Sequence, residues 1–97
     1  MESQAQSVSR SDLGIEEVAA IVRGVIAHHL KVRPEEVPLE SKLESELEID
    51  SMAMIEINVS LEERFRVAMP DMAVATSVST VRDLARFIHA KLAEGSR

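Results

Sequence analysis

The sequence contains no cysteine, tryptophan or tyrosine, and these absences narrow what the protein can be. Without cysteine the chain cannot form a disulfide, use a thiol nucleophile of its own or hold a metal through sulfur. Only two aromatic residues occur, Phe65 and Phe87, so the core must rely on aliphatic side chains and some of the five methionines. A hydrophobic share of 45% in 97 residues still suffices for one small folded domain.

Long apolar runs are also missing. No stretch approaches the ~20 consecutive apolar residues that a membrane-spanning helix needs. The polar start MESQAQSVSR lacks the hydrophobic segment of a secretory signal. We therefore expect no membrane partner and a cytoplasmic location, and we interpret residues 1–10 as a disordered tail.

The chain also lacks an excess of basic residues, since its formal net charge is −6. Nucleic-acid binding is therefore not expected, since a phosphate backbone requires a basic surface. The acidic residues are concentrated in one part of the chain: residues 35–63 hold ten of them and a single basic residue, Lys42. Such a local field attracts basic partner surfaces to one side of the molecule.

Helical spacing of apolar residues predicts a first helix over about 12–30, with Ser11 or Asp12 as its N-terminal cap. The predicted core face of this helix consists of Ile15, Val18, Ala19, Val22, Val25, Ile26, His29 and Leu30. Two prolines then prevent a continuous helix, so residues 31–50 form a long connection. Four apolar residues are expected to hold this connection on the core: Leu39, Leu43, Leu47 and Ile49.

The second predicted helix, over about 51–67, has two apolar stripes instead of one. The stripe that is free of charge is assigned to the core, since a core face excludes unpaired charges. It consists of Met54, Ile57, Leu61 and Phe65. The opposite stripe is expected to be exposed, and it combines Met52, Ile55 and Val59 with Glu56, Glu62 and Glu63.

The last predicted helix spans about 81–93, where Thr80 and Asp83 have the spacing of a capping box. Its expected core face is Val81, Leu84, Ala85, Ile88 and Leu92. A short helix near 71–76 is expected before it, and residues 94–97 are expected to form a disordered tail. No strand alternation occurs, so the predicted fold is an all-α bundle of three main helices and a short third one, with a long loop between the first two.

Ser51 stands where the acidic connection meets the second helix, and two interpretations fit it. It is either only a helix cap or an acceptor that another enzyme modifies. The three histidines, which are His28, His29 and His89, belong to other predicted elements. A serine without a neighbouring base is a poor nucleophile, so no catalytic residue is assigned.

Metal binding is not expected either. His28 and His29 are adjacent in the first predicted helix, so their side chains point to different sides of it. The acidic run lacks the glycine and the spacing of an EF-hand calcium loop.

The stretch LEIDSMAMIEINVSLEERF resembles the signature of acyl carrier proteins, in which an Asp-Ser-Met or Asp-Ser-Leu triplet opens the second helix. The flanking stretches VRPEEVPLESKL and VAMPD…STVRDLARFI extend this resemblance over about residues 13–92. The resemblance implies an acyl carrier domain over 11–93 with the four-helix bundle of that family.

By this resemblance, Ser51 receives 4′-phosphopantetheine from coenzyme A, and Asp50 helps to position the motif. Partner enzymes would dock on Met52, Ile55, Glu56, Val59, Glu62 and Glu63. The protein would be a monomeric carrier of thioester-linked acyl groups and not an enzyme. Its expected partners are a phosphopantetheinyl transferase, an acyl-loading ligase or acyltransferase, and downstream synthase, condensing or acyl-modifying enzymes.

Three departures from the family pattern bear on which pathway is served. Glu48 stands where the family often has glycine, Ala53 where it often has an acid, and Asn58 where it usually has an apolar residue. They suggest a carrier dedicated to one pathway of fatty-acid, polyketide or lipid-modified natural-product synthesis. The alternative is an aminoacyl or peptidyl carrier of a nonribosomal peptide or D-alanine-transfer pathway, although the Gly-Gly-[HD]-Ser motif of peptidyl carriers is absent.

Overall fold

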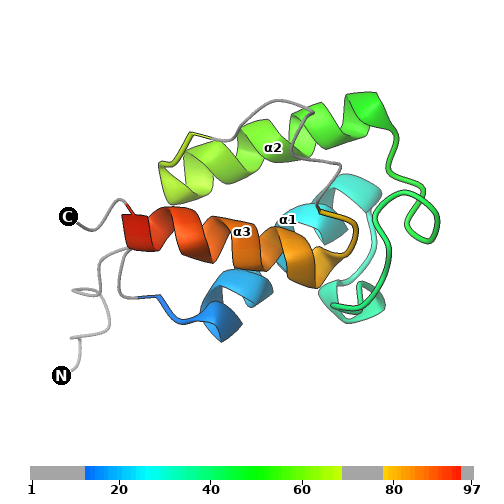
Figure 1. Cartoon of the computed structure of the whole chain (residues 1–97). Coiled ribbons are helices and arrows are strands. Elements are labelled where there is room, and N and C mark those ends of the chain that lie inside the picture. Colours follow the sequence, from blue (N-terminus) through cyan, green and yellow to red (C-terminus); the bar gives the residue numbers. More distant parts are fainter. Residues whose placement is uncertain (1–12, 69–77, 95–97) are drawn as a thin grey trace, which may run out of the picture.

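The computed structural model describes residues 13–68 and 78–94, and these are helical with connecting loops (Figure 1). The elements are α1 (Ile15–Leu30), the short 3-10 helix η3 (Pro34–Glu36), α2 (Ser51–Phe65) and α3 (Val81–Glu94). The described ranges contain no strand, only an isolated bridge between Lys42 and Thr80. The predicted all-α architecture with a long first connection is confirmed, whereas the short helix expected near 71–76 lies outside the described residues.

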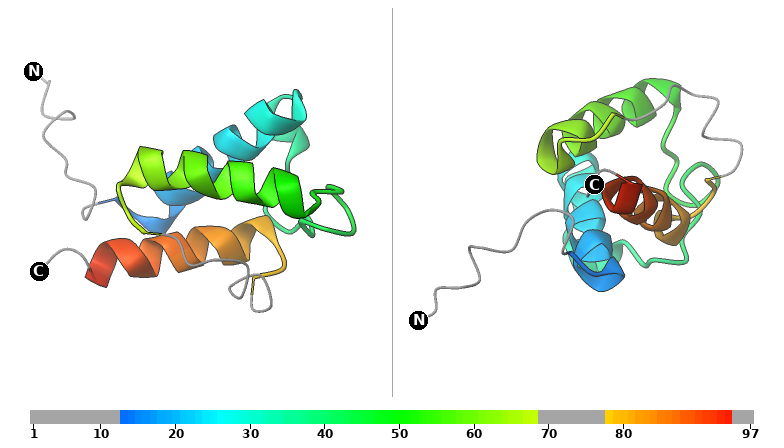
Figure 2. Two further views of the ribbon diagram at one scale, coloured as in Figure 1. Left: turned by 90° about the horizontal axis from the view of Figure 1, so that it is seen from above. Right: turned by 60° about the vertical axis from the view of Figure 1, so that its left-hand side comes forward.

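The three long helices form a bundle in which α2 and α3 run in the same direction and α1 runs the opposite way across them (Figures 1 and 2). The backbone of α1 approaches both other helices closely, whereas α2 and α3 approach each other less closely. Residues 31–50 wrap around the end of the bundle at which α2 and α3 both begin (Figure 1).

The core contains most of the residues that the helical spacing placed there, although Ile15 and Leu30 only pack against it and His29 is half-buried outside it. All predicted core residues of α2 and α3 are buried, as are the central ones of α1. Leu43 and Ile49 are buried beneath the long connection, and Leu39 and Leu47 pack against the same core. Val37, which the sequence pattern did not indicate, is fully buried as well.

The start of α1 differs from the prediction. The helix begins at Ile15, and Gly14 is its N-cap, so neither Ser11 nor Asp12 caps it. The Gly14 carbonyl accepts the N–H of Val18 at 3.0 Å, and Glu17 Oε1 accepts the Gly14 N–H at 2.8 Å. The Glu17 carboxylate therefore satisfies this helix end, which the pattern of polar residues before it did not reveal.

The end of α2 also differs from the prediction, since the helix ends at Phe65 and not near residue 67. Arg66 adopts a left-handed conformation with φ of 58°, and its N–H donates to the Glu62 carbonyl at 2.7 Å. This geometry closes the helix as a glycine usually does, although no glycine is present to mark the position in the sequence.

The long connection is fastened to α1 and to the start of α3. Arg23 of α1 donates through Nε to the Val37 carbonyl at 2.9 Å and through Nη2 to the Pro34 carbonyl at 3.2 Å. Two backbone pairs, Leu43 N–H to Ser79 O and Val81 N–H to Ser41 O, join it to the segment that enters α3. The loop before α2 is therefore held from both sides and presents α2 in a defined position.

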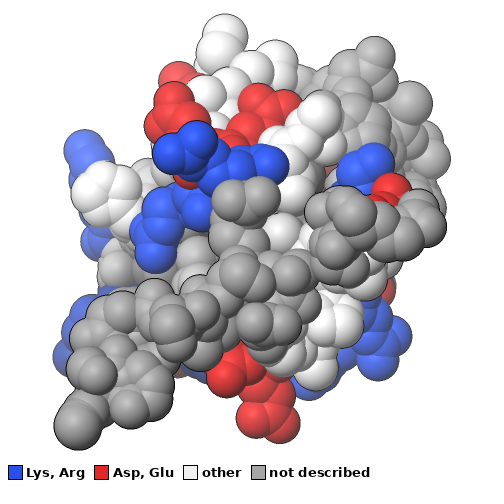
Figure 3. Space-filling view, turned by 90° about the vertical axis from the view of Figure 1, so that its left-hand side faces the viewer, with Lys and Arg blue, Asp and Glu red and all other residues white. Residues whose placement is uncertain are grey.

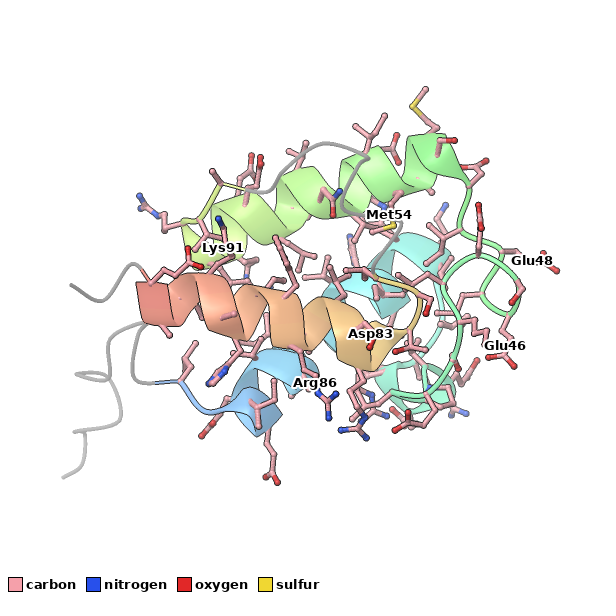
Figure 4. The ribbon with its side chains drawn as sticks, in the orientation of Figure 1. Glu46, Glu48, Met54, Asp83, Arg86 and Lys91 are labelled. Carbon is pink, nitrogen blue, oxygen red and sulfur yellow. The ribbon has the colours of Figure 1, made fainter. Side chains whose placement is uncertain are left out.

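The capping box predicted at the start of α3 is confirmed. Thr80 Oγ1 accepts the N–H of Asp83 at 3.1 Å, and Asp83 Oδ2 accepts the N–H groups of Thr80 at 3.2 Å and Ser79 at 3.1 Å (Figure 4). These backbone donors favour the ionised carboxylate and lower the pKa of Asp83. The helix continues through Glu94, one residue beyond the predicted end and into the expected tail.

Asp83→Asn is expected to lower the free energy of unfolding by about 1 kcal/mol at neutral pH, because it weakens this capping box. The folded state lowers the pKa of Asp83, so the carboxylate stabilises the fold above its unfolded pKa. That contribution disappears as the pH falls below about 4 and through the folded pKa. Urea denaturation should therefore show that the free energies of unfolding of the variant and the wild type differ less at pH 3 than at pH 7. A difference independent of pH would contradict this account.

Candidate functional site

The junction between the long connection and α2 is capped by Asp50 and not by Ser51. Asp50 has the extended backbone of an N-cap residue, and its Oδ1 accepts the N–H of Ala53 at 2.9 Å. Ser51 is the first residue of the helix and is exposed. Since the cap is provided by its neighbour, the Ser51 hydroxyl is not required for capping.

The N-terminal end of α2 also gives Ser51 a favourable electrostatic setting for an anion. Asp50 satisfies the N–H of Ala53, whereas helix geometry directs the N–H groups of Ser51 and Met52 out of the helix end. The helix dipole adds partial positive charge at this point. A phosphate ester on the Ser51 oxygen would therefore fit the residues around it.

His29 does not act as a base that would make Ser51 a nucleophile. Its Nε2 lies 3.4 Å from Ser60 Oγ, and its Nδ1 lies 3.8 Å from Glu56 Oε1. Both partners lie further along α2, Ser60 on the side that faces α1 and Glu56 on an exposed edge of the helix. The ring of His29 therefore joins α1 to α2 instead of serving the start of α2.

A cavity of about 230 Å³ opens beside Ser51. Its wall is formed by the end of the long connection, the first turn of α2 and the segment before α3: Lys42, Leu43, Glu44, Ser45, Ile49, Asp50, Ser51, Met54, Val78 and Ser79. Met54 points from α2 toward the interior of the bundle (Figure 4). The serine therefore lies at the rim of a space with an apolar inner wall.

The outer strip of α2, which consists of Met52, Ile55, Glu56, Val59, Glu62 and Glu63, faces away from the core as predicted. Three large apolar side chains are exposed on it: Met52 is 65% exposed, Ile55 48% and Val59 47%. Glu56 and Glu63 are exposed beside them, and Glu62 is half-buried. The outer strip starts next to Ser51 and continues along the helix.

Two basic residues mark the end of α2 opposite Ser51. The last turn of α2 and its C-cap provide Arg64 and Arg66. Figure 3 looks onto this end and shows Lys and Arg side chains there, with some acidic ones beside them. Arg23 and Arg82 lie against the long connection, so basic side chains are not confined to the far end. The acidic excess near Ser51 is that of the loop itself.

Glu48 adopts the left-handed backbone conformation, with φ of 58°. The sequence has glutamate where the family often has glycine, and glycine adopts this left-handed conformation more readily. The Glu48 side chain extends from the outer side of the loop, near Glu46 (Figure 4). The loop before Ser51 thus presents a carboxylate from a backbone conformation that residues with side chains rarely adopt.

Glu48→Gly is expected to raise the free energy of unfolding by about 0.5 to 1 kcal/mol. It removes left-handed strain of about 1–2 kcal/mol, and the greater flexibility of glycine in the unfolded chain offsets part of that gain. Glu44→Gly in the same loop is the matched control. Because Glu44 has no positive φ, this substitution relieves no strain and only increases the entropy of the unfolded chain. Chemical denaturation should show stabilisation for the first variant and destabilisation for the second, and the reverse order would disprove the strain.

Comparison with known proteins agrees with this geometry. The family described as "Phosphopantetheine attachment site" matches residues 20–88. The chain is 39% identical over 67 residues to the acyl carrier protein of Wolinella succinogenes. The aligned stretch covers 69% of this chain and 87% of that protein. The chain is 36% identical over 77 residues to the acyl carrier protein of Thermosynechococcus vestitus, covering 79% and 94% respectively.

These matches define the chain as a phosphopantetheine-attachment protein. More particularly, it belongs to the acyl carrier protein family, and its prosthetic group is covalent 4′-phosphopantetheine. Members of this family are carriers and not catalysts. In the part of the chain that the structure describes, no helix is long and apolar enough to cross a membrane, and no group of His, Asp and Glu side chains is arranged to hold a metal ion.

Proposed function

We propose that Ser51 is the attachment residue and that the protein carries acyl intermediates through biosynthesis of fatty acids, polyketides or lipid-modified natural products. The observation that supports this proposal is that Ser51 is exposed in the first turn of α2, at the rim of a cavity. Asp50, and not Ser51, caps the helix, so the Ser51 hydroxyl is available. When bound, the prosthetic arm supplies the thiol on which an acyl group is held as a thioester.

The residues around Ser51 have distinct tasks in this proposal. Asp50 fixes the first turn of α2 through the N–H of Ala53 and so sets the direction of the Ser51 hydroxyl. The N–H groups of Ser51 and Met52 and the helix dipole stabilise the phosphate. Met54 and Leu43 exclude water from the inner wall of the cavity.

The outer strip of α2 is proposed to be the surface on which partner enzymes dock. Its glutamates would guide basic partner surfaces toward Ser51, and its exposed Met52, Ile55 and Val59 would be covered in the complex. A small contact of this kind suits a monomeric carrier that must leave one partner before it meets the next. The expected partners are the phosphopantetheinyl transferase, the loading enzyme and the downstream synthase or modifying enzymes.

The test is to incubate the unmodified protein with coenzyme A and a broad-specificity phosphopantetheinyl transferase and to measure the intact mass. The wild type is expected to gain the mass of one phosphopantetheinyl group. Ser51→Ala should gain none, whereas Ser60→Ala, a second serine of α2, should behave as the wild type. An unmodified wild type, or a Ser51→Ala variant that still gains mass, would refute the proposal.

A further inference from the structure

The side-chain carbonyl oxygen of Asn58 is buried and accepts no hydrogen bond from the residues that the structure describes. Unpaired buried polar atoms are rare in folded proteins, since each loses its hydrogen bonds to water without replacement. An apolar residue of similar size would avoid this loss at position 58. The unpaired oxygen is therefore free to accept a hydrogen bond from a donor outside the described residues, such as a bound group.

The position of Asn58 on α2 connects it to the candidate site. It follows Ser51 by seven residues, so the two residues lie on the same edge of the helix, within ~20° of each other and about 10 Å apart along the axis. Met54, one turn before Asn58, lines the cavity beside Ser51. Ser60, by contrast, lies near His29 of α1, so that residue marks the other edge.

The edge that carries Ser51 and Asn58 faces the less closely packed side of the bundle. The backbone of α2 approaches α1 more closely than it approaches α3. The cavity lies on this side too, since Val78 and Ser79, directly before α3, form part of its wall. Asn58 itself lies beyond the residues that line the cavity, one helical turn past Met54, so a chain that extended out of the cavity along α2 would reach it.

We propose that Asn58 selects the cargo, and that the protein carries an acyl chain bearing a hydroxyl group whose O–H donates to the Asn58 side-chain carbonyl. The inference rests on the proposed function, because it requires the cargo to be attached at Ser51. A plain hydrocarbon chain at this place leaves the amide oxygen unpaired, whereas a hydroxylated chain satisfies it. Sites built to pair with a hydroxyl discriminate strongly against analogues that lack it.

The test compares four cargoes of equal length: octanoyl and 3-, 5- and 7-hydroxyoctanoyl groups. Each is transferred with its arm from the coenzyme A thioester, and loading is verified by intact mass. For at least one hydroxyl position, the midpoint of thermal unfolding should lie about 4 to 8 °C above that of the octanoyl form. The NMR signals of the Asn58 side-chain amide should shift in the same sample and not in the octanoyl form.

Two variants separate cargo selection from a structural role. Asn58→Leu keeps the side-chain size and removes the unpaired oxygen, so it should fold and should unfold at the same temperature with every cargo. Ser60→Ala, on the other edge of α2, should retain the wild-type difference. The same comparison is made with the protein that carries the arm but no acyl group. If the arm alone stabilises the wild type and Asn58→Leu loses that stabilisation, the hydrogen-bonding partner of Asn58 belongs to the arm and the inference is wrong.

Failure of this inference is distinguishable from failure of the proposed function. If the wild type gains no mass from the coenzyme A thioesters, the attachment at Ser51 and the inference that rests on it are both refuted. If the mass increases but the four loaded forms unfold at the same temperature, the carrier role stands and Asn58 does not select a hydroxylated cargo.

Discussion

The double variant Glu56→Lys/Glu63→Lys is expected to lower kcat/KM for modification of Ser51 by about tenfold to a hundredfold at low salt. Both side chains are exposed on the outer strip of α2, so the substitutions reverse the local field without disturbing the core. Fields of this kind change association rates by about 10- to 1,000-fold. The measurement is the rate at which the transferase modifies the protein, followed by intact mass over time.

The matched control for this variant is Glu16→Lys/Glu94→Lys, which changes the net charge equally at exposed positions of α1 and α3. The control is expected to be modified at nearly the wild-type rate. The defect of the outer-strip variant should also shrink at high ionic strength, because salt screens exposed charges beyond about 10 Å at 0.1 M. Equal losses in the two variants would show that net charge matters and the outer strip does not.

Ile57→Ala is expected to lower the free energy of unfolding by about 3 kcal/mol, a large part of the ~5–15 kcal/mol typical of a small domain. Ile57 is fully buried, so truncation removes apolar contacts and leaves a cavity in the core. Ile55, two residues before it on the same helix, is 48% exposed. Ile55→Ala should therefore cost less than about 1 kcal/mol.

Urea denaturation followed by circular dichroism measures both isoleucine variants, and helicity of the folded states serves as a check on integrity. In the modification assay the order should reverse, because Ile55 belongs to the outer strip and Ile57 does not. Equal stability losses for the two variants would mean that the division of α2 into an inner and an outer face is incorrect.

The division of α2 into two faces was predictable because charge and periodicity indicate the same division. Met54 and Ile57 share a face without charge and are buried, whereas Met52 and Ile55 share a face with glutamates and are exposed. The capping box at Thr80 and Asp83 was predictable for a similar reason, since all of its determinants lie within four residues. The triplet around Ser51 indicated the family, which the comparisons confirmed.

The features that the sequence did not reveal depend on contacts between distant residues or on side chains with several possible uses. Gly14 caps α1 with the Glu17 carboxylate reaching back to its N–H, although Ser11 and Asp12 are residue types that cap helices more often than glycine. Arg23 holds the long connection through two carbonyl groups more than ten residues away, which no local pattern encodes. Val78 lies in the wall of the cavity but follows a weakly patterned stretch.

The common direction of α2 and α3 places the N-terminal ends of both helices around one cavity, which Ser51 and Ser79 line together. Backbone dipoles therefore attract an anion to a place that acidic side chains surround. Salt screens the exposed carboxylates more strongly than partly buried backbone groups. On the proposed function, the phosphate on Ser51 is therefore held at the helix ends more firmly at high salt, where the surrounding carboxylates are screened, than at low salt.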